Sequence, residues 1–109
     1  MTFEEYQEKS RRTAVYPSVG QNYIYPTLGL TSEAGEVADK IKKALRDHGG
    51  EVDEERRQNI ALELGDVLWY VAQIASEFKL SLEDIAAQNI TKLFSRQDRG
   101  VISGSGDKR

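Results

Sequence analysis

The sequence predicts an all-α fold, an antiparallel bundle of about four helices, and three observations favour it. Apolar residues recur at helical spacing in each long segment, and no segment alternates as a strand would. Capping residues or a proline precede or open the expected helices. The last three helices are joined by short connections, which favours antiparallel neighbours.

The first two helices are delimited by their end signals. We expect the first helix over residues 2–16, because Thr2 can cap it and Glu5 can complete a capping box. The second should begin near Pro26, a residue favoured at the first helical position, and end at His48 before two glycines. Its expected apolar face consists of Leu30, Ala34, Val37, Ile41 and Leu45.

The third and fourth helices should each follow a polar capping residue. Asp53 is expected to cap the third helix, and Ser81 the fourth, which should run to about Arg96. The chain is thus divided into a helical domain over residues 1–103 and a flexible Gly/Ser-containing tail over residues 104–109. The apolar stripe of the third helix consists of Ile60, Leu64, Val67, Val71, Ile74 and Phe78, and a polar band with Asp66, Tyr70, Gln73 and Glu77 lies beside it.

Composition excludes several classes of protein. The formal charge of −3 leaves no basic field for nonspecific binding of a nucleic-acid polymer, and no cysteine is available for a thiolate metal site. The sequence has no long apolar run and no signal-peptide pattern, so we expect a cytoplasmic protein without a membrane partner. A chain of 109 residues is short enough to gain apolar burial as a homodimer or homotetramer.

Two pairs of carboxylates interrupt the runs of apolar residues in the second and third expected helices. Glu33 and Glu36 are three residues apart, as are Glu63 and Asp66, so each pair shares one helix face. Two such charges about 4 Å apart repel each other by roughly 4 kcal/mol at an effective dielectric constant of 20. A divalent cation with oxygen ligands reverses the sign of this energy. The four acids therefore predict a Mg²⁺ site, with Mn²⁺ as a substitute.

The same two motifs resemble those of a known family. The letters E-A-G-E at residues 33–36 and E-L-G-D at residues 63–66 resemble the Glu-x-x-Glu and Glu-x-x-Asp signature of MazG-like all-α nucleotide pyrophosphohydrolases. The likeness extends over residues 28–109 and includes N-I-T-K-L-F-S-R in the fourth helix. It implies a hydrolase that cleaves a (d)NTP to a monophosphate and pyrophosphate. Carried over by position, the four acids are the metal ligands, and one of the glutamates can instead orient the attacking water.

Further side chains are candidates for binding the substrate. Lys40, Lys92 and Arg96 are cations that can contact the phosphates, and Asn89 can contact ribose or phosphate. Trp69 can stack on a base. The alternatives are solvated surface charges or ion pairs within one helix for the cations, and packing or an oligomer contact for the tryptophan.

Two other functions are compatible with these residues. A phosphoribosyl-ATP pyrophosphohydrolase would use the same chemistry on a different substrate. A noncatalytic helical interaction module would instead use the acids as a structural metal site or in salt bridges with lysine and arginine.

Overall fold

The structure, a computed structural model, describes residues 1–109 and contains four α-helices and no strand, which confirms the all-α prediction. The first helix ends five residues before the expected Tyr16, because the chain turns there and Tyr16 is buried against α3. The second begins two residues before Pro26. The helices are α1 (Phe3–Arg11), α2 (Ile24–His48), α3 (Glu54–Glu77) and α4 (Leu82–Asp98).

The predicted caps are present at three of the helices. Thr2 and Glu5 form the capping box, in which the Glu5 amide donates to Thr2 Oγ1 over 3.1 Å. The side chain of Asp53 accepts the Arg56 amide at 2.9 Å, and that of Ser81 accepts from the first turn of α4. Each cap satisfies a backbone donor that has no partner within its helix.

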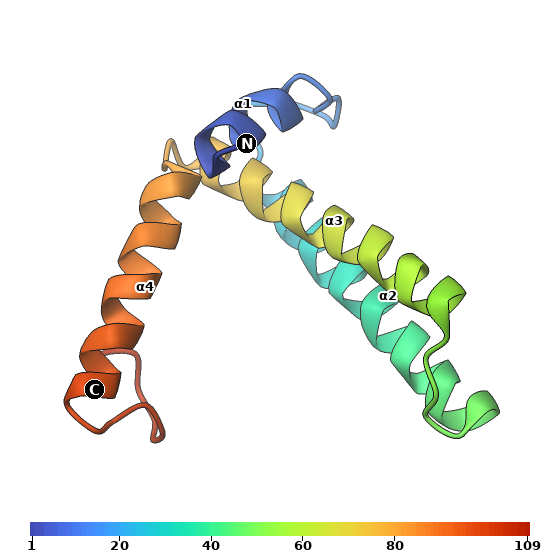
Figure 1. Cartoon of the computed structure of the whole chain (residues 1–109). Coiled ribbons are helices and arrows are strands. Elements are labelled where there is room, and N and C mark those ends of the chain that lie inside the picture. Colours follow the sequence, from blue (N-terminus) through green and yellow to red (C-terminus); the bar gives the residue numbers. More distant parts are fainter.

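Helices α2 and α3 lie side by side as an antiparallel hairpin, and α1 crosses the end of α3 (Figure 1). The first turn of α4 is anchored to α1, since the Leu82 amide donates to Gln7 Oε1 over 2.8 Å and Leu82 is buried. From this anchor α4 points away from the hairpin (Figure 1). The expectation that the short connection makes α3 and α4 antiparallel neighbours is therefore wrong within one chain. A left-handed residue in the connection, Lys79 at φ 56°, redirects the backbone.

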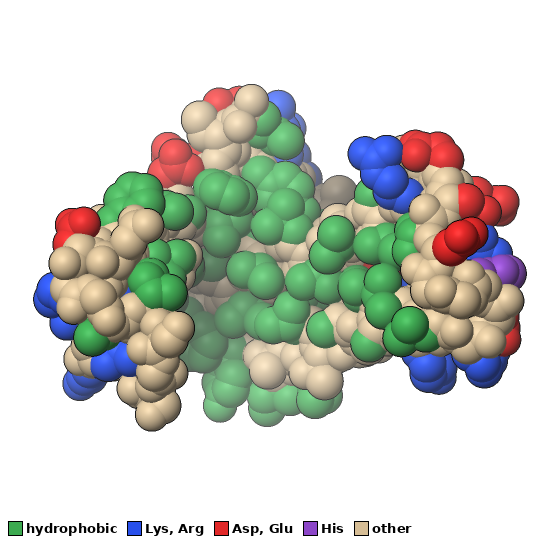
Figure 2. Space-filling view, turned by 60° about the horizontal axis from the view of Figure 1, so that its bottom comes forward, with side chains coloured by type: hydrophobic (Ala, Val, Ile, Leu, Met, Phe, Trp, Pro, Cys, Tyr) green, Lys and Arg blue, Asp and Glu red, His purple; other side chains and the backbone are tan.

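Much apolar surface stays exposed because α4 does not cover the hairpin. Three residues of the expected apolar faces are more than half exposed, namely Leu45, Leu64 and Phe78. The accessible surface is 7851 Å², whereas a compact chain of 12.3 kDa exposes about 6,100 Å². The radius of gyration is 16.8 Å, against about 13 Å for a compact domain of this length. Hydrophobic side chains gather in the hollow between α4 and the hairpin end (Figure 2).

None of the four helices combines the length with the apolar character that crossing a membrane requires.

A buried carboxylate ties the loop between α1 and α2 to the end of α3. Glu77, whose side chain is 1% exposed, accepts hydrogen bonds from the Arg11 guanidinium at 2.7 Å and the Tyr16 hydroxyl at 2.5 Å. It also accepts from the amides of Gly20 at 2.8 Å and Asn22 at 2.7 Å. Burial alone would raise the pKa of this carboxyl, but these donors outweigh it and lower the pKa from 4.5 to about 2. Glu77 is thus an anchor of the fold, and this end of the predicted polar band is buried against α1 and the following loop, with Arg11 contacting both Gln73 and Glu77.

Candidate functional site

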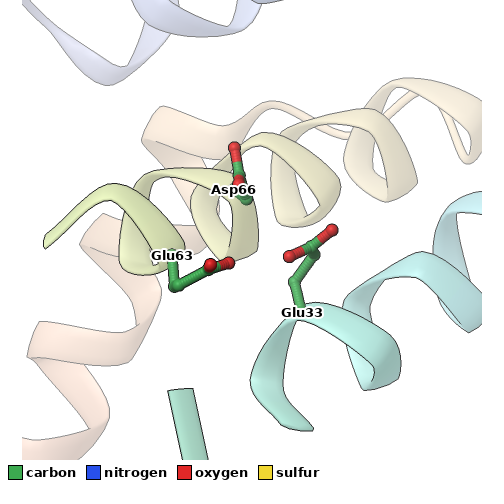
Figure 3. A group of neighbouring side chains, drawn as sticks. All are labelled: Glu33, Glu63 and Asp66. Carbon is green, nitrogen blue, oxygen red and sulfur yellow. The ribbon is translucent and has the colours of Figure 1, made fainter. Parts of the chain in front are cut away.

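Three of the four predicted metal ligands come together between α2 and α3. Glu33 from α2 and Glu63 and Asp66 from α3 each offer a carboxylate oxygen, and these oxygens lie within 4.8 Å of one another. Glu33 and Glu63 point toward each other across the hairpin, whereas Asp66 projects from the next turn of α3 (Figure 3). The antiparallel packing of the two helices brings these three acids together, because Glu33 on α2 lies opposite Glu63 and Asp66 on α3 (Figure 3).

The electrostatics of this acidic cluster are unfavourable without a cation. The pKa of Glu33 is raised by partial burial, by a hydrogen bond with the Glu63 carboxyl, and by the negative charges of Asp66, Glu63 and Glu36. The pKa of Tyr70 is raised by burial first, then by Tyr25, Glu33 and Asp66. In both groups burial is the largest cause of the raised pKa, and the negative charges of the cluster add to it.

Glu36 lies one turn beyond Glu33 on α2, with an exposed side chain, and does not belong to the group of three converging carboxylates. Its charge is nevertheless close enough to contribute to the raised pKa of Glu33. Lys40 is paired across the hairpin, with its Nζ 3.4 Å from Glu63 Oε1. Among the ion pairs within one helix that the sequence allowed, Lys40 could have paired with Glu36. In the structure Lys40 pairs with Glu63 of α3 instead.

The donor set of the cluster fits a hard divalent cation. The converging ligand atoms are all carboxylate oxygens, without thiolate or imidazole, which suits Mg²⁺ better than zinc or copper. One lysine is the only cationic side chain paired with these three acids, so a net negative charge remains for an ion to balance.

The predicted phosphate ligands of α4 lie apart from the acidic cluster within one chain, because α4 diverges from the hairpin (Figure 1). Lys92 Nζ is 2.8 Å from Asp107 Oδ1, and the buried Arg96 guanidinium is 3.1 Å from the same oxygen. Asn89 lines a cavity of about 390 Å³ beside Lys92 and Asp107. The tail of residues 104–109 thus folds back onto α4. Sequence reasoning missed Asp107 as the partner of these cations, although the glycines around it are the kind of residue that permits such a turn.

Trp69 packs α3 against the loop that follows α1. Its indole Nε1 donates to Thr13 Oγ1 over 2.8 Å, and its ring meets Tyr16 and Tyr70 edge-on with centroids 6.4 Å and 5.0 Å apart. These contacts agree with the packing role that the sequence left open, and base stacking by Trp69 stays a prediction.

A second cavity, of about 260 Å³, adjoins Glu33 and has an aromatic wall that sequence reasoning missed. Tyr25 and Tyr70 form this wall, and Ser32 and Leu28 complete the lining. Tyr70 crosses α2 at Gly29, where an added Cβ would lie 2.2 Å from the ring. Only glycine permits this approach, so the position of Tyr70 depends on a glycine that lies 41 residues earlier in the chain.

Comparison with known proteins gives a consistent result. The family model described as MazG nucleotide pyrophosphohydrolase domain matches residues 21–101, a range that holds α2, α3, α4 and the acidic cluster. The Gene 37 protein of Mycobacterium phage L5 is 46% identical over 114 aligned positions that cover all of both chains. No solved structure matches the chain.

Proposed function

The chain belongs to the MazG nucleotide pyrophosphohydrolase family, and from this premise we propose that it hydrolyses a nucleoside triphosphate between the α- and β-phosphates with Mg²⁺. The products are a nucleoside monophosphate and pyrophosphate. One observation carries the proposal: carboxylate oxygens of Glu33, Glu63 and Asp66 converge within 4.8 Å, inside the range matched by the family model.

In the proposed reaction, the acidic residues have two tasks. Glu33, Glu63 and Asp66 would hold the ion, with Glu36 completing the set as the resemblance implies. Bound Mg²⁺ supplies charge neutralisation at the phosphates and lowers the pKa of a water molecule. One glutamate of the set would orient a water molecule for attack on the α-phosphorus and would accept its proton. No serine, cysteine or histidine nucleophile is then needed.

Substrate positioning follows from the neighbours of the cluster. Lys40, now 3.4 Å from Glu63, is within reach of a phosphate bound beside the same carboxylates. The cavity walled by Tyr25 and Tyr70 adjoins Glu33 and offers flat aromatic surfaces to the nucleoside. A nucleotide with its phosphates at Lys40 and its nucleoside in this cavity would span the acidic cluster.

We further propose that the enzyme is a homodimer whose α4 helices act in trans. Each chain exposes about 1,750 Å² more than a compact chain of its mass, and two chains together could bury an area typical of obligate dimers. The exposed side chains lie in the hollow between α4 and the hairpin (Figure 2). A second copy seated there would carry its own Asn89, Lys92 and Arg96, the cations and amide that the acidic cluster lacks within one chain.

The first experiment incubates the protein with Mg²⁺ and a panel of ribo- and deoxynucleoside triphosphates, and then separates the products. We expect pyrophosphate and a monophosphate from at least one nucleotide, with turnover lost on chelation and in Glu63→Gln. The matched control is Glu55→Gln, an exposed acid in the first turn of the same helix, which should keep full activity.

Undiminished turnover in the Glu63→Gln variant would refute the assignment. Metal-dependent melting without phosphate release from any nucleotide, phosphoribosyl-ATP included, would point instead to the noncatalytic module.

A further inference from the structure

A basic cavity of about 250 Å³ lies between α2 and α3, toward the loop of the hairpin and beyond the acidic cluster. Its floor includes Ala44, which is only 3% exposed, so the cavity reaches into the packed interface of the two helices. Three of its side chains are basic and one is acidic. The polar lining consists of Lys40, Lys43, Asp47, His48, Arg56 and Asn59.

The lining of the cavity contains one acid beside the three cations, and each cation also has an acidic partner outside the lining. Asp47 is already held by the neighbouring Arg46, with both carboxylate oxygens accepting at 2.8 and 2.9 Å. Lys43 is held by Asp39 at 2.7 Å, and Arg56 by Asp53 at 2.7 Å, and neither of these two acids lines the cavity. These acids hold the cations in place, and because they do not line the cavity, the donor groups inside it outnumber its single carboxylate.

The guanidinium of Arg56 also contacts the ring of His48, which orders both groups against one wall. Arginine carries five N–H donors, so the contacts with Asp53 and His48 leave donors free for a ligand. A planar guanidinium with free donors is suited to bidentate binding of a phosphate. The amide of Asn59 adds a further donor on the same helix face, one turn after Arg56.

The basic cavity is continuous with the acidic cluster through a shared lysine. Lys40 lines the cavity, and its Nζ is 3.4 Å from Glu63 Oε1. Along α3, Asn59 precedes Glu63 by four residues, a separation of about 6 Å along the helix axis. A group bound at the acids could therefore extend directly into the basic cavity.

We propose that this cavity binds the pyrophosphate part of the substrate, the β- and γ-phosphates that leave as product. This inference rests on the proposed function and gives the nucleotide a direction, with its nucleoside toward Tyr25 and its terminal phosphates toward Arg56. In hydrolysis, the water oxygen bonds to the α-phosphorus and the bond from that phosphorus to the bridging oxygen breaks. The electron pair stays with the pyrophosphate, where Lys40, Lys43 and Arg56 stabilise the charge that develops.

The test uses inorganic pyrophosphate in the presence of Mg²⁺, with the affinity measured by calorimetry and the location by NMR. His48 is the only histidine in the chain, so its imidazole signal is assigned without ambiguity and comes from a side chain that lines this cavity. We expect a saturable shift of that signal, and about a 10- to 100-fold weaker affinity in Arg56→Gln, as for the loss of a charge-assisted hydrogen bond. Lys43→Gln should weaken binding in the same direction and serves as a second variant.

The matched control is Arg57→Gln. Arg57 is the next residue of α3 and pairs with Glu54 at 3.0 Å much as Arg56 pairs with Asp53, but it does not line the cavity. It should bind pyrophosphate as the wild type does. Equal affinities for the Arg56 and Arg57 variants, or an unmoved His48 signal at saturation, would overturn the proposal.

These readouts also separate the inference from the proposed function. A shifted His48 signal without hydrolysis of any nucleotide would remove the proposed function and retain the pyrophosphate site. Hydrolysis with an unmoved His48 signal would retain the function and refute this site.

Discussion

Substitution of Glu77 by glutamine should destabilise the protein through the loss of one buried charge. Four donors converge on this carboxylate, from Arg11, Tyr16, Gly20 and Asn22. They lower its pKa from 4.5 to about 2, which corresponds to about 3 kcal/mol of folding stability at neutral pH, at about 1.4 kcal/mol for each pH unit. Glutamine keeps the shape but turns an NH₂ group toward donors, so we expect a loss of about 3 kcal/mol.

The assay is chemical and thermal unfolding at one fixed protein concentration, since any assembly would make the midpoint depend on concentration. For a chain of this length, the expected loss lowers Tm by about 10 to 15 °C. The control is Glu8→Gln, an exposed acid of α1 without a side-chain partner, which should unfold like the wild type.

The pH dependence gives a second check on Glu77. Because the folded state has the lower pKa, the stabilisation is fully present above about pH 5 and is lost as the pH falls toward about 2. The unfolding free energies of wild type and variant should therefore differ by a constant amount near neutrality and converge in acid. A Glu77→Gln variant as stable as the Glu8 control at pH 7, or a difference that does not shrink in acid, would refute the reasoning.

Two further predictions concern the assembly and the tail. Light scattering should give twice the chain mass of 12.3 kDa. Mixing the inactive Glu63→Gln and Lys92→Gln variants should restore about a quarter of wild-type turnover, because half of the dimers are mixed and each mixed dimer has one intact site of two. No recovery of turnover would mean that α4 acts within its own chain or takes no part in the site. Replacing Asp107 by asparagine should lower KM for the triphosphate by about threefold, because Asp107 competes with the phosphates for Lys92. The change is small because an exposed ion pair contributes little free energy. Asp98→Asn, at the end of the same helix, is the control, and equal KM values in the two variants would argue against competition by the tail.

Local patterns accounted for the helices and for the acids. The capping residues Thr2, Asp53 and Ser81 act as their types predict, because a cap is formed by residues three positions apart in the chain. Glu33 and Glu63 could be singled out for the same reason, since a carboxylate inside an apolar helical run is unusual wherever the helix packs. Helical spacing then sufficed to predict that each acid pair shares a face.

Contacts between distant residues were beyond the reach of such patterns. The partners of Glu77 are 55 to 66 residues away in the sequence, and nothing near it in α3 distinguishes it from a solvated acid. Likewise, Lys40 could have paired with Glu36 on its own helix, and the packing of α2 on α3 directs it to Glu63. The basic cavity exists only because Lys40 and Arg56, on different helices, face the same gap.

The sequence by itself determined the helical class, the helix starts and the acid pairs, because backbone capping and helical periodicity depend on residues within about one turn. Only the tertiary structure decided which acids converge, which cations stand beside them, and that α4 leaves its own hairpin uncovered (Figure 1). These features depend on the angles at which helices cross and on single backbone conformations such as the left-handed Lys79. A small change in the backbone angles of Lys79 moves the whole of α4, and the periodicity of apolar residues within a helix cannot predict that change.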